Sequence, residues 1–232
     1  MNFLRTLAGD LADLCFPRLC LICERQLVTG EEHICLHCLS RIPETHYHLL
    51  PENPMEQLFY GRVPVEKAFA FFYFTAGGDF RKLVHTFKYK GEKEAARTLG
   101  RLYALRLKDS GVLDNIDLIV PVPLHKKRQR HRGYNQSNWI AEGISCITGI
   151  KTNYAILRRR HNTATQTLKT GYDRWENIQG AFYLSSPLPA GNRHILLVDD
   201  VITTGATLVE CALTLRRNQE IKISVLTLGV AR

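Results

Sequence analysis

Apolar residues fill several short stretches of the chain almost without interruption, at 116–122, 194–199 and 221–230. A strand that is apolar at every position, and not only at alternate ones, is typical of a parallel sheet covered on both faces. A further run at 65–75 is rich in aromatic residues and also predicts a strand. These stretches predict the strands of one buried sheet, with short strands added near 154–158 and 181–184.

Between the strands, apolar residues recur at helical spacing. Asp79 is a good N-cap for the first helix, and Gly91 separates that helix from the second. Because strands alternate with helices, the pattern predicts an α/β fold in which helices flank a mainly parallel sheet. The predicted helices lie at about 79–89, 93–108, 134–148 and 206–217.

The beginning of the chain has a different pattern. Apolar residues at positions 3, 4, 7, 11 and 14 follow helical spacing, while Asp10 and Asp13 interrupt the apolar run. We expect a short amphipathic helix here and not a secretory signal. No stretch reaches the roughly 18–20 apolar residues of a membrane span, and the expected location is the cytoplasm.

The cysteines indicate a second chemistry. Four of the seven form two Cys-x2-Cys pairs, Cys20 with Cys23 and Cys35 with Cys38. In a reducing compartment two such pairs predict a tetrahedral Zn2+ site with four thiolate ligands, which is structural because no position stays open. His33 and His37 lie beside the second pair and are expected to be surface residues. The remaining cysteines, which lie outside this spacing, are expected to be buried: Cys15, Cys146 and Cys211.

The chain therefore divides into three predicted parts. Residues 1–45 form the N-terminal helix and the zinc-binding module. Residues 46–64, which contain several prolines, form a linker, and residues 65–232 form the α/β domain.

An excess of basic residues narrows the possible partners. Lys and Arg number 31 against 22 Asp and Glu, which gives a net charge of +9. Such a charge favours a polyanionic partner or a highly phosphorylated ligand, although a merely solvated basic surface stays open. The basic residues concentrate in predicted loops at 125–132 and 158–161, and flank Tyr89 at a predicted helix end. The candidates are Lys126, Lys127, Arg128, Arg130, Arg132, Arg159, Arg160, Lys88 and Lys90.

Aromatic side chains near these loops are candidates for stacking on nucleic-acid bases. They are Tyr134, Trp139, Tyr172 and Trp175. Trp139 falls on a predicted helix beside Ile140 and Ile144, so a place in the core is the stronger expectation for it.

The segment 195–208 carries the clearest candidate site. A buried strand delivers Asp199 and Asp200 to its carboxyl end, which is the edge of a parallel sheet where ligands bind. The turn that follows opens a helix, so backbone N–H groups and threonine hydroxyls converge on a small volume suited to a phosphate. The acidic pair can accept hydrogen bonds from sugar hydroxyls and help to hold Mg2+ through water. A ribose 5-phosphate fits both the acidic pair and the turn. The alternative interpretation of this segment is an ordinary strand, turn and helix without a ligand. The candidates in the turn are Thr203, Thr204, Gly205, Ala206 and Thr207.

At this point the residues resemble a known family. The run from Val198 to Thr207 is similar to the phosphoribosyl pyrophosphate (PRPP) motif of type I phosphoribosyltransferases. Together with further segments it resembles the ComF family of competence-associated proteins over nearly the whole chain. Those segments are the cysteine pairs, Phe87–Gly91, Pro121–His125, Arg132–Gln136, Thr163–Gln166, Arg174 and Asn177.

The resemblance implies a type I phosphoribosyltransferase-like twisted sheet that binds PRPP with Mg2+. Asp199 and Asp200 would hold the ribose hydroxyls, residues 203–207 the 5-phosphate, and the loop after 120–123 would face the pyrophosphate. The segment from about Arg159 to Gly180 would be a mobile loop. The implied role is the handling of single-stranded DNA in natural transformation, with a DNA-uptake helicase as a partner. The alternatives are an active phosphoribosyltransferase and a non-catalytic regulator that senses PRPP.

Overall fold

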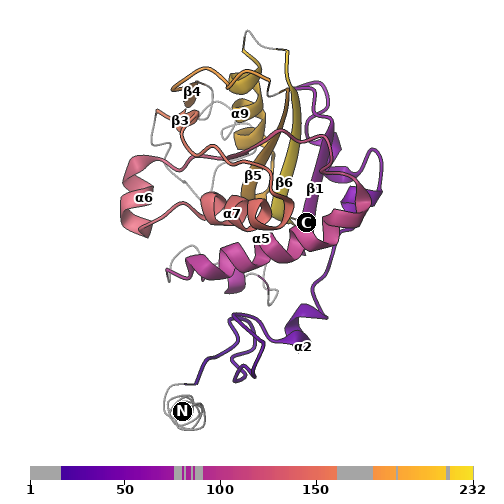
Figure 1. Ribbon diagram of the computed structural model, residues 1–232, viewed down its shortest axis with the longest axis vertical. Coiled ribbons are helices and arrows are strands. Elements are labelled where there is room, and N and C mark those ends of the chain that lie inside the picture. Colours follow the sequence, from indigo (N-terminus) through magenta and orange to yellow (C-terminus); the bar gives the residue numbers. More distant parts are fainter. Residues whose placement is uncertain are drawn as a thin grey trace.

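A computed structural model describes residues 17–75, 80, 82–84, 86, 91–160, 180–191, 193–217 and 220–231. Its centre is a four-stranded sheet in the order β1-β6-β5-β2, and all neighbouring strands are parallel (Figure 1). The strands are β1 (Lys67–Phe74), β2 (Leu118–Pro121), β5 (His194–Ile202) and β6 (Lys222–Ala231). Every strand falls within or beside a stretch that the hydrophobic pattern predicted.

Helices cover this sheet. Helices α5 (Lys93–Leu107) and α7 (Gln136–Thr148) run side by side, and α7 packs against β2 and β5 (Figure 1). Helix α9 (Ala206–Arg216) packs against β5. The connection from β1 to β2 crosses the sheet in the opposite direction to that from β5 to β6, so right-handed crossovers place α5 and α9 on opposite faces. The predicted fold class, a mainly parallel sheet flanked by helices, is confirmed.

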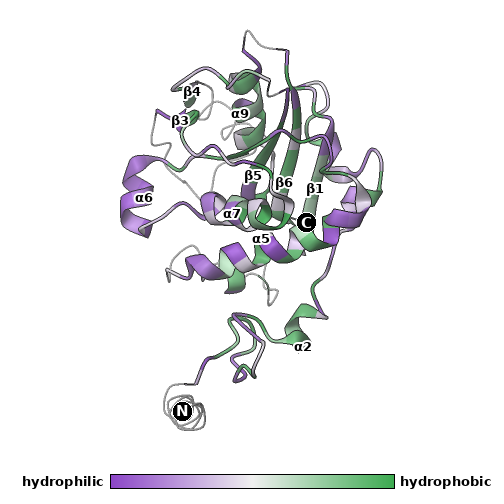
Figure 2. Ribbon diagram, in the orientation of Figure 1, coloured by the Kyte–Doolittle hydropathy of each residue, from purple (hydrophilic) through white to green (hydrophobic). Residues whose placement is uncertain are grey.

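The core follows the predicted hydrophobic pattern. In β6, every side chain from Ile223 to Leu228 is buried, and so is that of Val230. In β5, all four side chains of Ile195–Val198 are buried. Figure 2 shows these central strands as largely hydrophobic, in contrast to the hydrophilic helix α6 (Lys126–Arg132). Cys211 is buried as expected, whereas Cys146 is exposed, because it lies on the face of α7 turned away from the core.

Both edges of the sheet are covered by short backbone pairings. Beside β1, the Thr45 N–H donates to the Phe71 carbonyl and the Tyr73 N–H to the Pro43 carbonyl. Beside β2, the Ile119 N–H donates to the Lys151 carbonyl, and Ile119 forms a parallel bridge with Thr152. The backbone groups that an edge strand would otherwise present to solvent are therefore partly satisfied within the chain.

Residues 46–64, predicted as a linker, pack onto β1. They include a 3-10 helix (Tyr47–Leu49) and helix α3 (Pro54–Gln57). The buried Asn53 caps α3 by accepting from the Met55 N–H, and its amide donates to the Ala68 carbonyl of the strand. The proposed boundaries at 45 and 64 stay predictions, but the segment between them is ordered by these contacts.

The basic segment 125–132, predicted as a loop, is the helix α6, which corrects the prediction. The His125 side chain caps it by accepting from the Lys127 N–H, and Gly133 ends it with a left-handed φ of 81°. Lys, Arg and Gln are good helix formers, so the local propensity outweighs the repulsion between the charges.

Two short strands form a separate hairpin-like pair. Strand β3 (Leu157–Arg159) and strand β4 (Phe182–Leu184) are antiparallel, and β4 packs against α9. They match the strands predicted near 154–158 and 181–184. Between them, residues 161–179 lie outside the described residues.

Several other predictions also lie outside the described residues. They concern the N-terminal helix, Cys15, Lys88, Lys90, Tyr172 and Trp175. None of the helices in the described ranges combines the length and the apolar character that a membrane crossing requires.

Candidate functional site

The four predicted zinc ligands come together. The sulfur atoms of Cys20, Cys23, Cys35 and Cys38 all lie within 4.8 Å of one another. Those of Cys23 and Cys35 are 3.7 Å apart. Ligands on a tetrahedron with Zn–S bonds of about 2.3 Å are separated by about 3.8 Å, so the thiols fit a zinc ion. Neither His33 nor His37 belongs to the cluster.

Local backbone structure builds this arrangement. The turn after Cys20 is closed by hydrogen bonds from the Cys20 N–H to Arg25 and from the Glu24 N–H back to Cys20, with Glu24 at a left-handed φ of 60°. Cys35 is the N-cap of the short helix α2 (Leu36–Leu39), which carries Cys38. Two tight turns therefore face each other across the cluster.

The electrostatics of the cluster favour a bound cation. Burial acts to raise the pKa of Cys20, but backbone N–H groups of Cys23, Cys35 and Ile22 stabilise the thiolate, and the net pKa is about 7. Burial and the neighbouring thiols raise the pKa of Cys38 far above its usual value. A divalent ion held by these cysteines would supply the positive charge that lets all four thiols ionise together.

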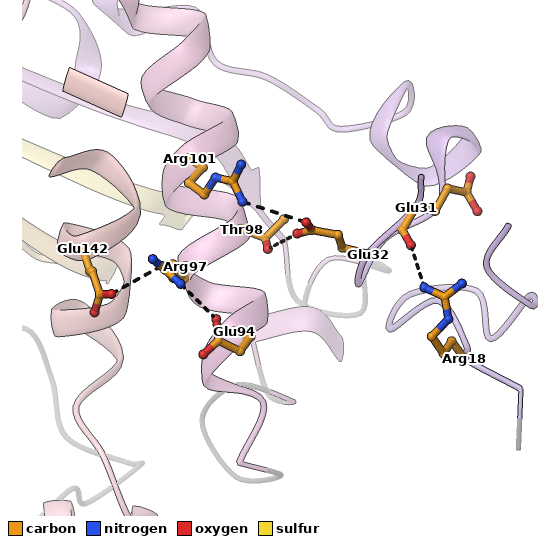
Figure 3. A network of polar contacts seen from close by, with 8 residues as sticks. All are labelled: Arg18, Glu31, Glu32, Glu94, Arg97, Thr98, Arg101 and Glu142. Carbon is orange, nitrogen blue, oxygen red and sulfur yellow. Dashed lines mark hydrogen bonds and ion pairs between the residues drawn. The ribbon is translucent and has the colours of Figure 1, made fainter. Parts of the chain in front are cut away.

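The cysteine module is tied to α5 by polar contacts (Figure 3). The Glu32 carboxylate accepts from the Thr98 hydroxyl at 3.0 Å and lies 3.9 Å from the Arg101 guanidinium. On the same helix, Arg97 forms ion pairs with Glu94 and with Glu142 of α7. These side chains are partly exposed, so each pair contributes little by itself and the network mainly sets orientation.

The acidic pair lies where the sequence predicted it. Asp199 and Asp200 are half-buried near the carboxyl end of β5. One oxygen of Asp199 accepts from the Asp200 N–H and from the Ser137 hydroxyl, each at 2.9 Å. Ser137 is buried in the first turn of α7, and sequence reasoning missed it. The only available signal was a hydroxyl at the start of a helix that follows a neighbouring parallel strand.

The turn after β5 forms a small hollow. Residues 203–205 lead into α9, and Gly205 takes a left-handed φ of 73° as its N-cap. The first N–H groups of a helix lack intrahelical acceptors and attract anions. The hollow has a volume of about 90 Å³, and among its lining residues are Asp199, Thr203, Thr204 and Thr207. Gly205 and Ala206 also line the hollow and are buried.

Arg62 forms hydrogen bonds with this turn, a contact that sequence reasoning did not predict. Its guanidinium donates to the Thr204 carbonyl at 2.9 Å and to the Leu58 carbonyl at 3.0 Å. A Cβ added at Gly205 would lie 3.9 Å from the same guanidinium nitrogen. The segment between the cysteine module and β1 therefore positions the turn.

We expect Arg62→Ala to destabilise the protein by about 1–3 kcal/mol, because two partly buried carbonyls lose a charged donor. Urea unfolding followed by circular dichroism measures the change. Arg217→Ala, on an exposed arginine after α9, serves as the control and should shift stability by less than about 0.5 kcal/mol. Equal unfolding midpoints for Arg62→Ala and wild type would contradict this role for Arg62.

The basic helix lies beside the acidic pair. Strand β2 pairs with β5 so that Pro121 faces Val198, and the Val122 N–H donates to the Val198 carbonyl. The chain then enters α6, whose exposed residues include Lys126, Lys127 and Arg130, while Arg128 and Arg132 are half-buried. The predicted approach of this segment to the carboxyl edge therefore agrees with the strand register.

Arg159 points inward from β3, unlike its neighbours. Its guanidinium lies over the Phe182 ring at 5.3 Å. Burial lowers its pKa, and so does Arg128, while Asp199 acts in the opposite direction. Arg159 thus belongs to the charge cluster around the acidic pair, whereas Arg158 and Arg160 are exposed.

The described aromatic candidates, Tyr134 and Trp139, are both half-buried. Burial raises the pKa of Tyr134 to about 12, with a contribution from Glu92. Trp139 is half-buried, and the Lys93 ammonium lies 4.7 Å from its ring centroid. Their use for base stacking stays a prediction.

Comparison with known proteins places the chain among relatives of similar length. No family model matches it. The DNA utilization protein YhgH of Escherichia coli (strain K12) is 32% identical over 223 residues, which cover 91% of this chain and 96% of the relative. Competence protein F of Haemophilus influenzae is 37% identical over 139 residues, 58% of this chain and 61% of the relative. Competence protein ComFC of Bacillus subtilis is 22% identical over 221 residues, 82% and 85% of the two chains.

Among solved structures, a glutamine PRPP amidotransferase from Bacillus subtilis, complexed with ADP and GMP, shows a TM-score of 0.42 and 17% identity over 62% of this chain and 30% of its own. The sequence relatives carry the assignment, because YhgH matches at 32% identity over 96% of its length. The chain belongs to the ComF family, together with YhgH and the competence proteins F and ComFC.

Proposed function

We propose that this protein binds PRPP with Mg2+ in the hollow after β5 and acts on single-stranded DNA. The observation that carries the PRPP half is that Asp199 lines the hollow together with the turn that opens α9, with Asp200 next to it on β5. The acidic pair lies close to the start of a helix, which attracts anions. A ribose 5-phosphate has hydroxyl groups that can donate to the carboxylates and a phosphate that suits the helix start.

Each group in the hollow has a distinct task in this proposal. The carboxylates accept hydrogen bonds from ribose hydroxyls, and Ser137 keeps Asp199 oriented for this purpose. The N–H groups at the start of α9, with the hydroxyls of Thr203 and Thr207, hold the 5-phosphate. Asp199 and Asp200 would help to hold Mg2+ through water, where it would neutralise charge on the pyrophosphate, and Arg159 would add positive charge there.

The DNA half of the proposal is supported by charge and by the relatives. Helix α6 carries five Lys and Arg residues between Lys126 and Arg132. Cations that neutralise phosphates release counterions, which gives strong, salt-sensitive binding to nucleic acid. The relatives are named as a DNA utilization protein and as competence proteins. A role in the handling of DNA connects the two observations.

Isothermal titration with PRPP and Mg2+ tests the first half. We expect Asp200→Asn to weaken PRPP binding about tenfold or more, because hydrogen bonds to a charged group contribute about 1.5–3 kcal/mol. Asp109→Asn, an exposed carboxylate after α5, is the matched control and should bind as wild type does. PRPP should also bind more tightly than ribose 5-phosphate or pyrophosphate alone.

Two outcomes would contradict the binding of PRPP in the hollow after β5. One is that wild type shows no heat of binding with PRPP at millimolar concentration. The other is that Asp109→Asn weakens binding as much as Asp200→Asn does, because the loss would then not be specific to the acidic pair.

A further inference from the structure

The hairpin-like pair β3–β4 has two chemically different faces. In an antiparallel pair, residues in register lie on the same face. Leu157 with Leu184, and Arg159 with Phe182, form the face packed toward the core. Arg158 pairs with Tyr183 on the opposite face, where Arg158 is exposed and Tyr183 is 38% exposed.

Tyr183 is placed between two arginines. The Arg160 guanidinium lies 5.2 Å from the centroid of its ring, and Arg158 is its partner across the strands. In the described part of the chain, neither arginine forms an ion pair with an acidic side chain. An aromatic ring between cations on a strand is a common arrangement for holding a base while the flanking charges contact phosphates.

The basic helix α6 lies near the β3–β4 pair. Arg128 of α6 lowers the pKa of Arg159 on β3, which places the two elements within electrostatic reach of each other. Figure 1 shows α6 and the β3–β4 pair on the same side of the molecule. The exposed cations of α6 and of β3 therefore belong to one basic side of the protein.

Other exposed tyrosines do not share this setting. Tyr154 is 44% exposed, and the Glu142 carboxylate acts on its hydroxyl. Tyr60 is 57% exposed and lies near Glu52 and Glu56. Carboxylates next to a ring repel the phosphates of a nucleic acid, so these two tyrosines are poor sites for a base.

We propose that Tyr183 stacks on a base of single-stranded DNA, with Arg158 and Arg160 contacting the adjacent phosphates. This proposal rests on the proposed DNA-binding function and names the subsite that binds a base. Because stacking engages the face of any base, the site would bind single strands without sequence preference and would not bind paired bases inside a duplex.

Fluorescence anisotropy with two labelled strands tests the proposal. One strand is an oligothymidylate, and the other is an abasic phosphodiester of equal length and charge. We expect wild type to bind the oligothymidylate about tenfold more tightly than the abasic strand. Tyr183→Leu should lose this preference by weakening only the oligothymidylate complex, whereas Tyr183→Phe should keep it. Tyr154→Leu is the matched control and should behave as wild type.

The salt dependence separates stacking from charge. Since Tyr183 contributes no charge, Tyr183→Leu should leave the slope of affinity against salt unchanged, while Arg158→Ala should make it shallower. Thermal unfolding of Tyr183→Leu should match that of wild type, because the ring is partly exposed.

Several results would overturn the proposal. The stacking role would be contradicted if wild type bound both strands with equal affinity. It would also be contradicted if Tyr183→Leu lost affinity equally for both strands. Neither result would contradict salt-dependent binding of DNA. If wild type bound neither strand, the DNA half of the proposed function would fail too. The PRPP titration reports on the hollow after β5 independently of all these outcomes.

Discussion

Removal of zinc is expected to unfold the cysteine module while the α/β domain stays folded. Within the described residues 17–45, the buried apolar side chains include Ile22, Leu27 and Ile34, and the one helix, α2, spans four residues. A segment of this size cannot bury enough surface to fold alone. Metal binding to structural zinc sites contributes an apparent free energy of about 10–16 kcal/mol at pH 7, so its loss should exceed what the rest of the module supplies.

Cys35→Ser provides the genetic version of this experiment. Elemental analysis should find one zinc per wild-type chain and much less in the variant. Limited proteolysis should then cut the variant within residues 17–45 and leave the region of α5 and α7 intact. Cys146→Ser is the control, because Cys146 is an exposed cysteine on α7 outside the cluster, and it should retain zinc. Full zinc content in Cys35→Ser, or equal protease resistance, would contradict the assignment.

Gly143→Ala is expected to destabilise the α/β domain by about 2–3 kcal/mol or more, as overpacking of a tight core does. A Cβ at Gly143 would collide with the backbone carbonyl of Arg97, and one at Gly100 would collide with that of Ile140. Helices α5 and α7 meet at these two glycines, so neither backbone can move aside without separating the pair. Backbone atoms, unlike the end of a flexible side chain, cannot yield locally.

Urea unfolding measures the stability of Gly143→Ala against wild type. Cys146→Ala, three residues further along the same helix and exposed, should change stability by less than about 0.5 kcal/mol. Because α7 also carries Ser137 to Asp199, a shift of this helix should weaken PRPP binding in the folded variant as well. Unchanged stability in Gly143→Ala would show that the two helices can separate at little cost.

The strands, the longer helices α5, α7 and α9, and the acidic pair with the turn after it were predictable because each depends on local sequence. A strand buried on both faces is apolar throughout, and the Cys-x2-Cys pairs specify their own geometry. The contacts of Ser137 and Arg62 were not predictable in this way. Ser137 is 62 residues from Asp199, and Arg62 is 142 residues from Thr204, so only the folded topology brings them together.

The prediction for 125–132 was wrong for a different reason. The dense positive charge suggested a loop, but the capping by His125 and the helix propensity of Lys and Arg decide the local structure. Tyr183 was not among the stacking candidates, because its contact with Arg160 depends on the pairing of β3 with β4.

The pairing of residues 43–45 with β1 has a consequence for how the protein fails. These residues follow the last cysteine of the cluster closely in the sequence. Because they pair with the edge strand β1, they prevent another polypeptide from pairing with that edge of the sheet. If loss of the metal also released residues 43–45 from β1, this aromatic-rich strand would be exposed to other copies of the protein. Metal starvation would then show itself first as precipitation of the protein in a concentration-dependent manner, before any loss of the central sheet.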